Sequence, residues 1–188
     1  MSPNSWFSQP AYIPSGDPDT MSVPTLDKPG QLGIRFNILN PPRTPGSESS
    51  EDGSPRGYKI VKTDSTMSVA PFDGAVAWFS DQANNVVTTS PTALGRGRVA
   101  GVFKSAVVVG HYCCIQQKGK ARVKFIDAVV AANVTAAGNF VIPSATAAKA
   151  DVIAAGTAAT YPLLGRSASA LNLPDATAIV DLDVPDTL

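Results

Sequence analysis

The chain contains one histidine, which lies two residues before a pair of adjacent cysteines. A cysteine beside a histidine can form the nucleophile and base of an acyl-transfer enzyme. His111, Cys113 and Cys114 fall in one β-type run, however, and residues so close in one strand seldom face a shared substrate. A disulfide between neighbouring cysteines would also distort the strand. We therefore expect His111 in a turn or at a strand start, and the cysteines as two free strand residues without a catalytic role.

Carboxylates that could act in acid–base catalysis or hold a metal ion are few. Glutamate occurs only at positions 48 and 51, so a carboxylate pair elsewhere would consist of aspartates. Asp181 and Asp183 would share one face of a strand, where calcium binding is conceivable. The glycine-bearing loop of an EF-hand is missing, and a solvated strand end is the simpler interpretation. The sequence predicts no catalytic, metal-binding or cofactor-binding residue.

Two basic stretches contain glycine and invite an anion-binding interpretation. Gly95 to Arg98 has the glycines and arginines that favour phosphate, but it lacks the lysine and the hydroxyl residue of a P-loop. We expect a turn there, with Arg96 and Arg98 reaching an acidic patch on a partner. The second stretch, Gln117 to Lys120, is followed by two more cations. It predicts a tight hairpin turn with its cations on the exposed face.

The elements that must carry these residues divide near position 56. Residues 1–56 hold 10 of the 16 prolines, together with nine serines and five glycines. Such a composition cannot bury enough apolar surface to offset the entropy of ordering the chain. We predict an extended N-terminal arm and linker over residues 1–56 and one β-rich domain over residues 57–188.

The arm contains two groups of residues suited to contacting another surface. Residues 32–39 alternate apolar and other side chains, which predicts a strand that adds to a sheet edge, its own or a neighbour's. Aromatic residues are scarce in disordered tails, so those near the tip indicate anchors for pockets on a partner, and a tail packed on its own body is the alternative. With the two arginines, the candidate partner-binding residues are Trp6, Phe7, Tyr12, Ile34, Phe36, Ile38, Arg96 and Arg98.

The body presents short β-type segments separated by turn residues, a pattern that favours an all-β sandwich or barrel. Residues 128–160 contain 13 alanines, so a short helix or a loop competes with strands in that region. The expected strands are 58–62, 75–79, 86–89, 98–103, 112–117, 122–125, 140–142, 161–164 and 179–182.

A weak internal repeat is visible at an offset of about 64 residues. Residues 99–106 align with residues 163–170, which places Gly101 on Gly165. In each copy a second β-type run follows about ten residues later. The repeat predicts two related β-lobes, although β-proteins also reuse similar turns without being duplicated.

The charge balance bears on the partners. The 15 basic and 15 acidic residues form no strong basic field, so we expect no binding to nucleic acid. Charged residues make up 16% of the chain, below the value of about a quarter in typical soluble domains, which fits a surface partly covered by partners. The sequence shows no signal-peptide pattern and no apolar run long enough to span a bilayer, so we expect no membrane contact.

Several glycine-led runs resemble the small capsid decoration, or cement, proteins of tailed bacteriophages. In those proteins a glycine opens a β run, a short polar hairpin with glycine follows, and a Leu-Gly-Arg-Ala-type element precedes the last strand. The corresponding segments here are 101–103, 110–123, 164–168 (Leu-Gly-Arg-Ser-Ala) and 178–182. The resemblance covers residues 57–188 and not the long arm.

The resemblance implies a mainly β fold, with a β-tulip or β-sandwich-like body and here an extended N-terminal arm. It implies a non-enzymatic structural protein of the virion, made in the host cytoplasm, that binds the outer surface of an icosahedral phage head. The partner would be the major capsid protein, whose neighbouring subunits it would bridge as a homotrimer, without cofactor, nucleic acid or membrane. The arm would lie as a strap over the shell or over a sister subunit.

Other interpretations stay open. A tail protein or the base of a head fibre would share the β-rich body and differ in its partner, although a trimeric fibre normally shows longer repeats. A carbohydrate-binding β-sandwich would need exposed aromatic residues on one face, whereas Trp78 lies in an apolar run and is expected in the core. An enzyme would need a catalytic constellation that neither His111 nor the aspartates provide.

Overall fold

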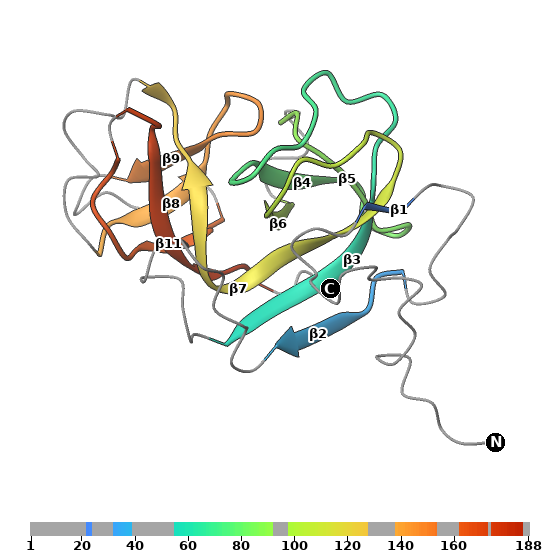
Figure 1. Ribbon diagram of the computed structural model, residues 1–188, viewed down its shortest axis with the longest axis horizontal. Helices are drawn as coiled ribbons and strands as arrows, with labels where there is room; N and C mark the ends of the chain where they lie inside the picture. The colour runs from blue at the N-terminus through green and yellow to red at the C-terminus, as the bar shows by residue number, and fades with distance from the viewer. Residues whose placement is uncertain are drawn as a thin grey trace.

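The computed structural model describes residues 22–23, 32–38, 55–91, 98–127, 138–153, 162–172 and 174–185. These residues form one sheet of eleven strands, which confirms the expected mainly β fold. Figure 1 shows two β-rich lobes joined by the long strand β7, with β3 and β2 beside one half of it. The strands are β1 (Ser22–Val23), β2 (Arg35–Ile38), β3 (Arg56–Thr63), β4 (Val76–Asp81), β5 (Val86–Thr88), β6 (Val99–Phe103), β7 (Tyr112–Lys124), β8 (Phe140–Pro143), β9 (Ala150–Ile153), β10 (Gly165–Ser167) and β11 (Thr177–Asp183).

The first lobe is a closed five-strand barrel, which we call barrel 1. In hydrogen-bonded order, β3 pairs with β5, β5 with β4, β4 with β6, β6 with β7, and β7 with β3 again. The β3–β5 pair is parallel and the others are antiparallel. The part of β7 that pairs within barrel 1 extends from Tyr112 to Lys118.

The second lobe, barrel 2, begins where barrel 1 ends on the same strand. Residues 118–124 of β7 pair with β11, and β10, β8 and β9 follow in order. A parallel bridge between Phe125, just after β7, and Ala150 of β9 closes the ring. Each barrel is therefore closed by one parallel contact between its first and third strands in chain order.

The two barrels repeat the same pairing residue by residue. Strands β3, β4, β5, β6 and the first half of β7 correspond to the second half of β7, β8, β9, β10 and β11. This correspondence confirms the two related lobes that the repeat predicted. The matched pairs include Ala77–Gly101 with Val141–Gly165, Val102–Gln116 with Arg166–Asp181, Tyr58–Gln116 with Lys120–Asp181, and Thr63–Val87 with Phe125–Ala150.

One glycine recurs at the same place in both barrels for a steric reason. A Cβ on Gly101 would collide with the carbonyl oxygen of Gln116, and a Cβ on Gly165 would collide with that of Asp181. Their φ angles of +151° and +158° are also rarely adopted by other residues. The neighbouring strand can approach closely in each barrel only because no side chain stands in the way.

Strand β7 runs unbroken through residues 117–120, so the predicted hairpin turn is wrong. Gly119 has a φ of +82° and bends the strand without reversing it. The side chain of Gln116 spans the bend. Its Nε2 donates to the carbonyl oxygens of Lys118 and Lys120, on either side of Gly119, at 2.9 and 3.0 Å. The strand continues because it has partners on both sides of the bend, β3 before it and β11 after it.

Two other expectations change. In the described part of the alanine-rich region, β8 confirms the strand expected over 140–142, and β9 is a strand that was not expected; residues 128–137 and 154–160 lie outside the described residues. Ala150 is completely buried in β9, where its small side chain fits the narrow barrel interior and does not mark a helix. The strand expected over 161–164 begins instead at Gly165, as β10.

The barrels are packed directly against each other. Phe79 and Ile115 belong to the cluster that fills barrel 1. Phe125 belongs to the cluster in barrel 2, which also takes in Val76 and Trp78 from β4. Since neighbouring strand residues point to opposite faces, Val76 and Trp78 lie on the outside of barrel 1 and connect it to barrel 2. Trp78 is therefore a core residue, as predicted.

Candidate functional site

Four predicted partner-binding residues, Trp6, Phe7, Tyr12 and Arg96, lie outside the described residues. Their roles stay predictions. The structure places Phe36 and Ile38 on β2, Ile34 immediately before it, and Arg98 immediately before β6.

The arm strand pairs with its own chain. β2 adds antiparallel to β3, and Phe36 stacks on Tyr58 with the ring centroids 5.6 Å apart. Phe36 is only 9% exposed, and Ile38 packs on the same cluster. Phe36 and Ile38 therefore cover the outside of barrel 1, as expected for a strand that adds to its own sheet edge, and their contact with a partner stays a prediction. Ile34 lies at the surface, 36% exposed.

Two like charges face each other between β2 and β3. Arg35 is the cross-strand partner of Lys59. Burial, and after it the nearby Arg35 guanidinium, lowers the pKa of Lys59. Like charges that face each other across two strands oppose pairing. The apolar contacts of Phe36 and Ile38 and the backbone hydrogen bonds of β2 act against this repulsion.

Arg98 is exposed immediately before β6. It lines an open hollow of about 620 Å³ together with Asp81 and its neighbours in the β4–β5 turn. The side chain and then the backbone amide of Asn84 donate hydrogen bonds to Asp81, and these lower the pKa of the Asp81 carboxyl. An arginine at the rim of such an open hollow can reach an acidic surface, but its surroundings do not define a ligand.

The histidine and the cysteines are placed as predicted. Cys113 faces the interior of barrel 1, Cys114 faces the opposite side, and both are free thiols. Burial, and then the adjacent Cys114, raises the pKa of the Cys113 thiol well above its usual range. His111 lies in the turn before β7, where its carbonyl oxygen accepts hydrogen bonds from Thr63 N and Oγ1 at 2.8 and 3.0 Å. A buried, protonated thiol is a poor nucleophile.

A row of aromatic and charged side chains crosses the outside of barrel 2. Phe140 of β8, Arg166 of β10, Asp181 of β11 and Lys120 of β7 are successive Cα partners, and we call these four residues the outer row. Cross-strand partners share one face of a sheet. The Arg166 guanidinium lies 4.2 Å from the centroid of the Phe140 ring, and both side chains are exposed.

A hollow of about 510 Å³ lies beside the outer row. Gly165 contributes no side chain to its lining, Phe140 and Leu163 contribute apolar surface, and Arg166, Asp181 and Asp183 contribute charge. Asp181 and Asp183 are the pair considered for calcium, and each is the cross-strand partner of a lysine. An open lining with apolar area and both signs of charge is typical of protein contact surfaces.

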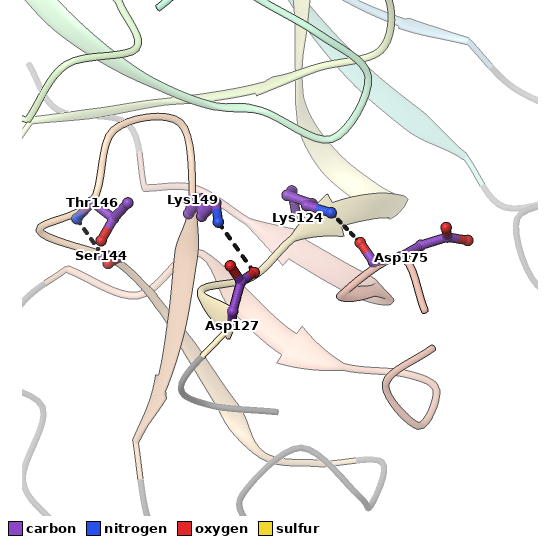
Figure 2. Close-up of polar contacts among 6 residues, drawn as sticks. All are labelled: Lys124, Asp127, Ser144, Thr146, Lys149 and Asp175. Atoms are coloured by element: carbon purple, nitrogen blue, oxygen red, sulfur yellow. Dashed lines mark hydrogen bonds and ion pairs between the residues drawn. The ribbon is translucent and has the colours of Figure 1, made fainter. Parts of the chain in front are cut away.

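Polar contacts stabilise the turns at the ends of the strands of barrel 2 (Figure 2). Lys149 Nζ lies 3.2 Å from Asp127 Oδ1, and Lys124 Nζ donates to the Asp175 carbonyl oxygen. Ser144 Oγ accepts a hydrogen bond from the Thr146 amide at 2.9 Å. The Asp127 side chain is 78% exposed, so its ion pair contributes little free energy. These contacts join turns to strands and have no evident chemical role.

Sequence reasoning missed the outer row, although the repeat contains the signal. Arg166 occupies the position of Val102 in barrel 1, and Phe140 occupies the position of Val76. Both valines are completely buried. The buried valines of barrel 1 are replaced by an exposed arginine and an exposed phenylalanine at the equivalent positions of barrel 2. This difference indicates that the outer face of barrel 2 does not pack within the chain as the outer face of barrel 1 does.

No family model, curated protein or solved structure matches this chain. In the part of the chain that the structure describes, no group of three or more His, Cys, Asp or Glu side chains could hold a metal ion. The same residues include no helix with the length and apolar character needed to cross a membrane.

Proposed function

We propose that the protein is a non-enzymatic capsid decoration, or cement, protein that binds the outer surface of an icosahedral phage head and bridges neighbouring major capsid subunits. The resemblance of residues 101–103, 110–123 and 164–168 to such proteins supports this function. These segments lie in or beside β6, β7 and β10; β6 and β10 are equivalent strands of the two barrels, and β7 belongs to both barrels.

The observation that carries the proposal is a continuous strand path from the arm through both barrels. β1 pairs with the start of β7, β2 pairs with β3, and β7 belongs to both barrels. Tension along paired strands is shared by many hydrogen bonds, each of modest free energy. A strap held on one capsid subunit would thus be coupled to a body held on its neighbour.

Shell stabilisation in this proposal follows from mass action. A protein that binds the assembled shell but not its loosened state stabilises each site by about 2.7 kcal/mol when free protein is at a hundred times the dissociation constant. Ordering an extended arm costs entropy, so the arm binds tightly only where the lattice presents several subunits together. Assembled shells are thereby favoured over free subunits.

The proposed arrangement follows the family resemblance. The protein is made in the host cytoplasm and lies on the outside of the shell as a homotrimer. Trp6, Phe7 and Tyr12 fill pockets on the major capsid protein or on a sister subunit, because buried aromatic side chains supply much of the binding free energy of protein interfaces. Arg96 and Arg98 face an acidic patch on the shell.

Co-sedimentation with expanded phage shells tests the proposal. We expect the full chain to bind saturably, and a variant without residues 1–21, which keeps β1 and β2, to bind at least about tenfold more weakly. Alanine at Trp6, Phe7 and Tyr12 should reproduce the deletion, whereas the control Gln9→Ala should not. Absence of binding by the full chain would refute the capsid function, and equal binding without the arm would refute the strap.

A further inference from the structure

The duplication provides a reference for the surface of barrel 2. In barrel 1 the positions equivalent to the outer row are Val76, Val102, Gln116 and Tyr58, which are Cα partners in the same order. All four are at most 2% exposed. Tyr58 packs with Phe36 of β2, while the two valines pack with barrel 2. The chain itself therefore covers this face of barrel 1.

The outer row of barrel 2 carries a defined order of chemical types. From β8 to β7 the order is aromatic, cation, anion and cation, in Phe140, Arg166, Asp181 and Lys120. The guanidinium of Arg166 lies over Phe140, on the side of β10 away from β11. Asp181, on β11, has an exposed side chain. The row thus presents an arginine and an aspartate side by side at its centre.

We propose that the outer row is a two-fold contact between two copies of this chain. A two-fold axis parallel to the strands, between β10 and β11, reverses the row of the second copy. Arg166 then faces Asp181 of the second copy, Phe140 faces Lys120 of the second copy, and each contact occurs twice. An ion pair of arginine with a carboxylate and a cation–π contact of lysine with an aromatic ring are both favourable. The row is complementary to its own reverse.

The hollow beside the row has the form that such a contact needs. A two-fold contact uses the same patch on both copies, so the patch must contain both projecting and receding parts. Phe140 projects, 36% exposed, and Gly165 leaves the neighbouring space open. Phe140 and Leu163 supply the apolar part of the contact, while Arg166 and Asp181 supply charge next to the axis. This contact does not depend on binding to a capsid, because it joins two copies in free solution, whereas the homotrimer proposed above forms on the shell.

Charge reversal tests the two-fold contact. Arg166→Asp and Asp181→Arg should each raise the dimer dissociation constant at least about tenfold, because like charges then meet near the axis. Mixed in equal amounts, the two variants should pair with each other, since both contacts of the mixed dimer join an acid to an arginine. A chain with both substitutions should self-associate but should not pair with the unchanged chain.

Sedimentation velocity of the full chain over a concentration series, without shells, measures these outcomes independently of the capsid function. Arg98→Asp reverses an exposed arginine outside the row and should leave the dimer unchanged. Pairing of the mixed variants also shows that each is folded. A full chain that is monomeric throughout, or a dimer that both reversals leave intact, would overturn the proposal.

Photo-crosslinking identifies the occupant of the surface. Benzoylphenylalanine in place of Phe140 should crosslink to β7 near Lys120 of a second copy. Crosslinks to residues 1–21 instead would overturn the two-fold contact and identify the arm as the occupant.

Discussion

Barrel 1 and barrel 2 share one pattern of strand pairing and differ in what covers their outer faces. Barrel 1 buries Tyr58 with β2 and Val76 with barrel 2. At the positions of Val102 and Val76, barrel 2 exposes Arg166 and Phe140. The pairing pattern determines the shape of both lobes, whereas the outward side chains determine whether a face is used within the chain or by a partner.

The interiors are more alike than the outer faces. Cys113 and Ala178 occupy equivalent positions, as do Val61 and Val123, and all four side chains are buried. A closed barrel of five strands leaves little interior space, so both copies keep small or medium apolar residues at these two positions. The outer faces carry no such constraint, and the repeat is therefore weak in sequence.

Alanine at either of the two equivalent glycines should destabilise the fold, and this is the largest expected effect on stability. In Gly101→Ala and Gly165→Ala the new Cβ meets a carbonyl oxygen of the adjacent strand. We expect each to lower the free energy of unfolding by about 3 kcal/mol or more, measured by urea unfolding followed by circular dichroism. The control Gly138→Ala meets no atom within 4 Å and should cost about 1 kcal/mol. A large decrease in the free energy of unfolding for only one of the two glycine variants would contradict the equivalence of the two barrels.

Substituting two phenylalanines should distinguish an outer face that packs within the chain from one that contacts a second copy. Phe36→Ala removes a buried ring from barrel 1 and should lower the free energy of unfolding by about 3 kcal/mol. Phe140→Ala should cost less than about 1 kcal/mol in the monomer and should instead weaken self-association. Thermal unfolding and sedimentation velocity measure the two effects, and comparable stability losses at low protein concentration would count against the contrast.

Gln116 and Asp181 test the same contrast at the centre of the row. Gln116→Leu leaves the carbonyl oxygens of Lys118 and Lys120 without this donor, which should lower the free energy of unfolding by about 2 kcal/mol. Asp181→Leu, at the equivalent exposed position, should change it by no more than about 0.5 kcal/mol. Chemical unfolding of the two variants in parallel measures both free energies of unfolding. An equal decrease in the two variants would contradict the contrast between a buried position in barrel 1 and an exposed position in barrel 2.

The smallest expected effect is a loss of stability at alkaline pH that comes from barrel 1. Burial, then Cys114, raises the pKa of Cys113 in the folded state, while an unfolded thiol ionises near pH ~8.5. The stability that the protonated thiol contributes is complete below that pH and is lost as the pH rises further. Cys113→Ala, which copies Ala178 of barrel 2, should flatten the decline in unfolding free energy between neutral and alkaline pH. If the substitution leaves the decline in unfolding free energy unchanged, titratable groups other than Cys113 cause it.

Local patterns predicted much of this architecture. Short apolar runs between turn residues located β6 and the first half of β7, and the geometry of a strand placed the adjacent Cys113 and Cys114 on opposite faces. The alignment of Gly101 with Gly165 indicated the duplication, because a close approach between strands requires glycine at the same place in each copy.

Long-range pairing produced what local patterns could not predict. A glycine between lysines has the same local composition in a hairpin and in a bent strand, and the pairing of β7 with the distant β11 decides between them. The outer row draws one residue from each of four strands, so it exists only once the register is known. The alternation in the arm predicted β2 but could not show that its partner is β3 of its own chain.

Calorimetry of expanded phage shells, with and without the full chain, tests the central functional claim most directly. If the protein is a cement, the shell's melting temperature rises as protein is added and levels off once the sites are filled, because only the assembled shell binds it. A shell transition that stays unchanged in excess protein would contradict the account.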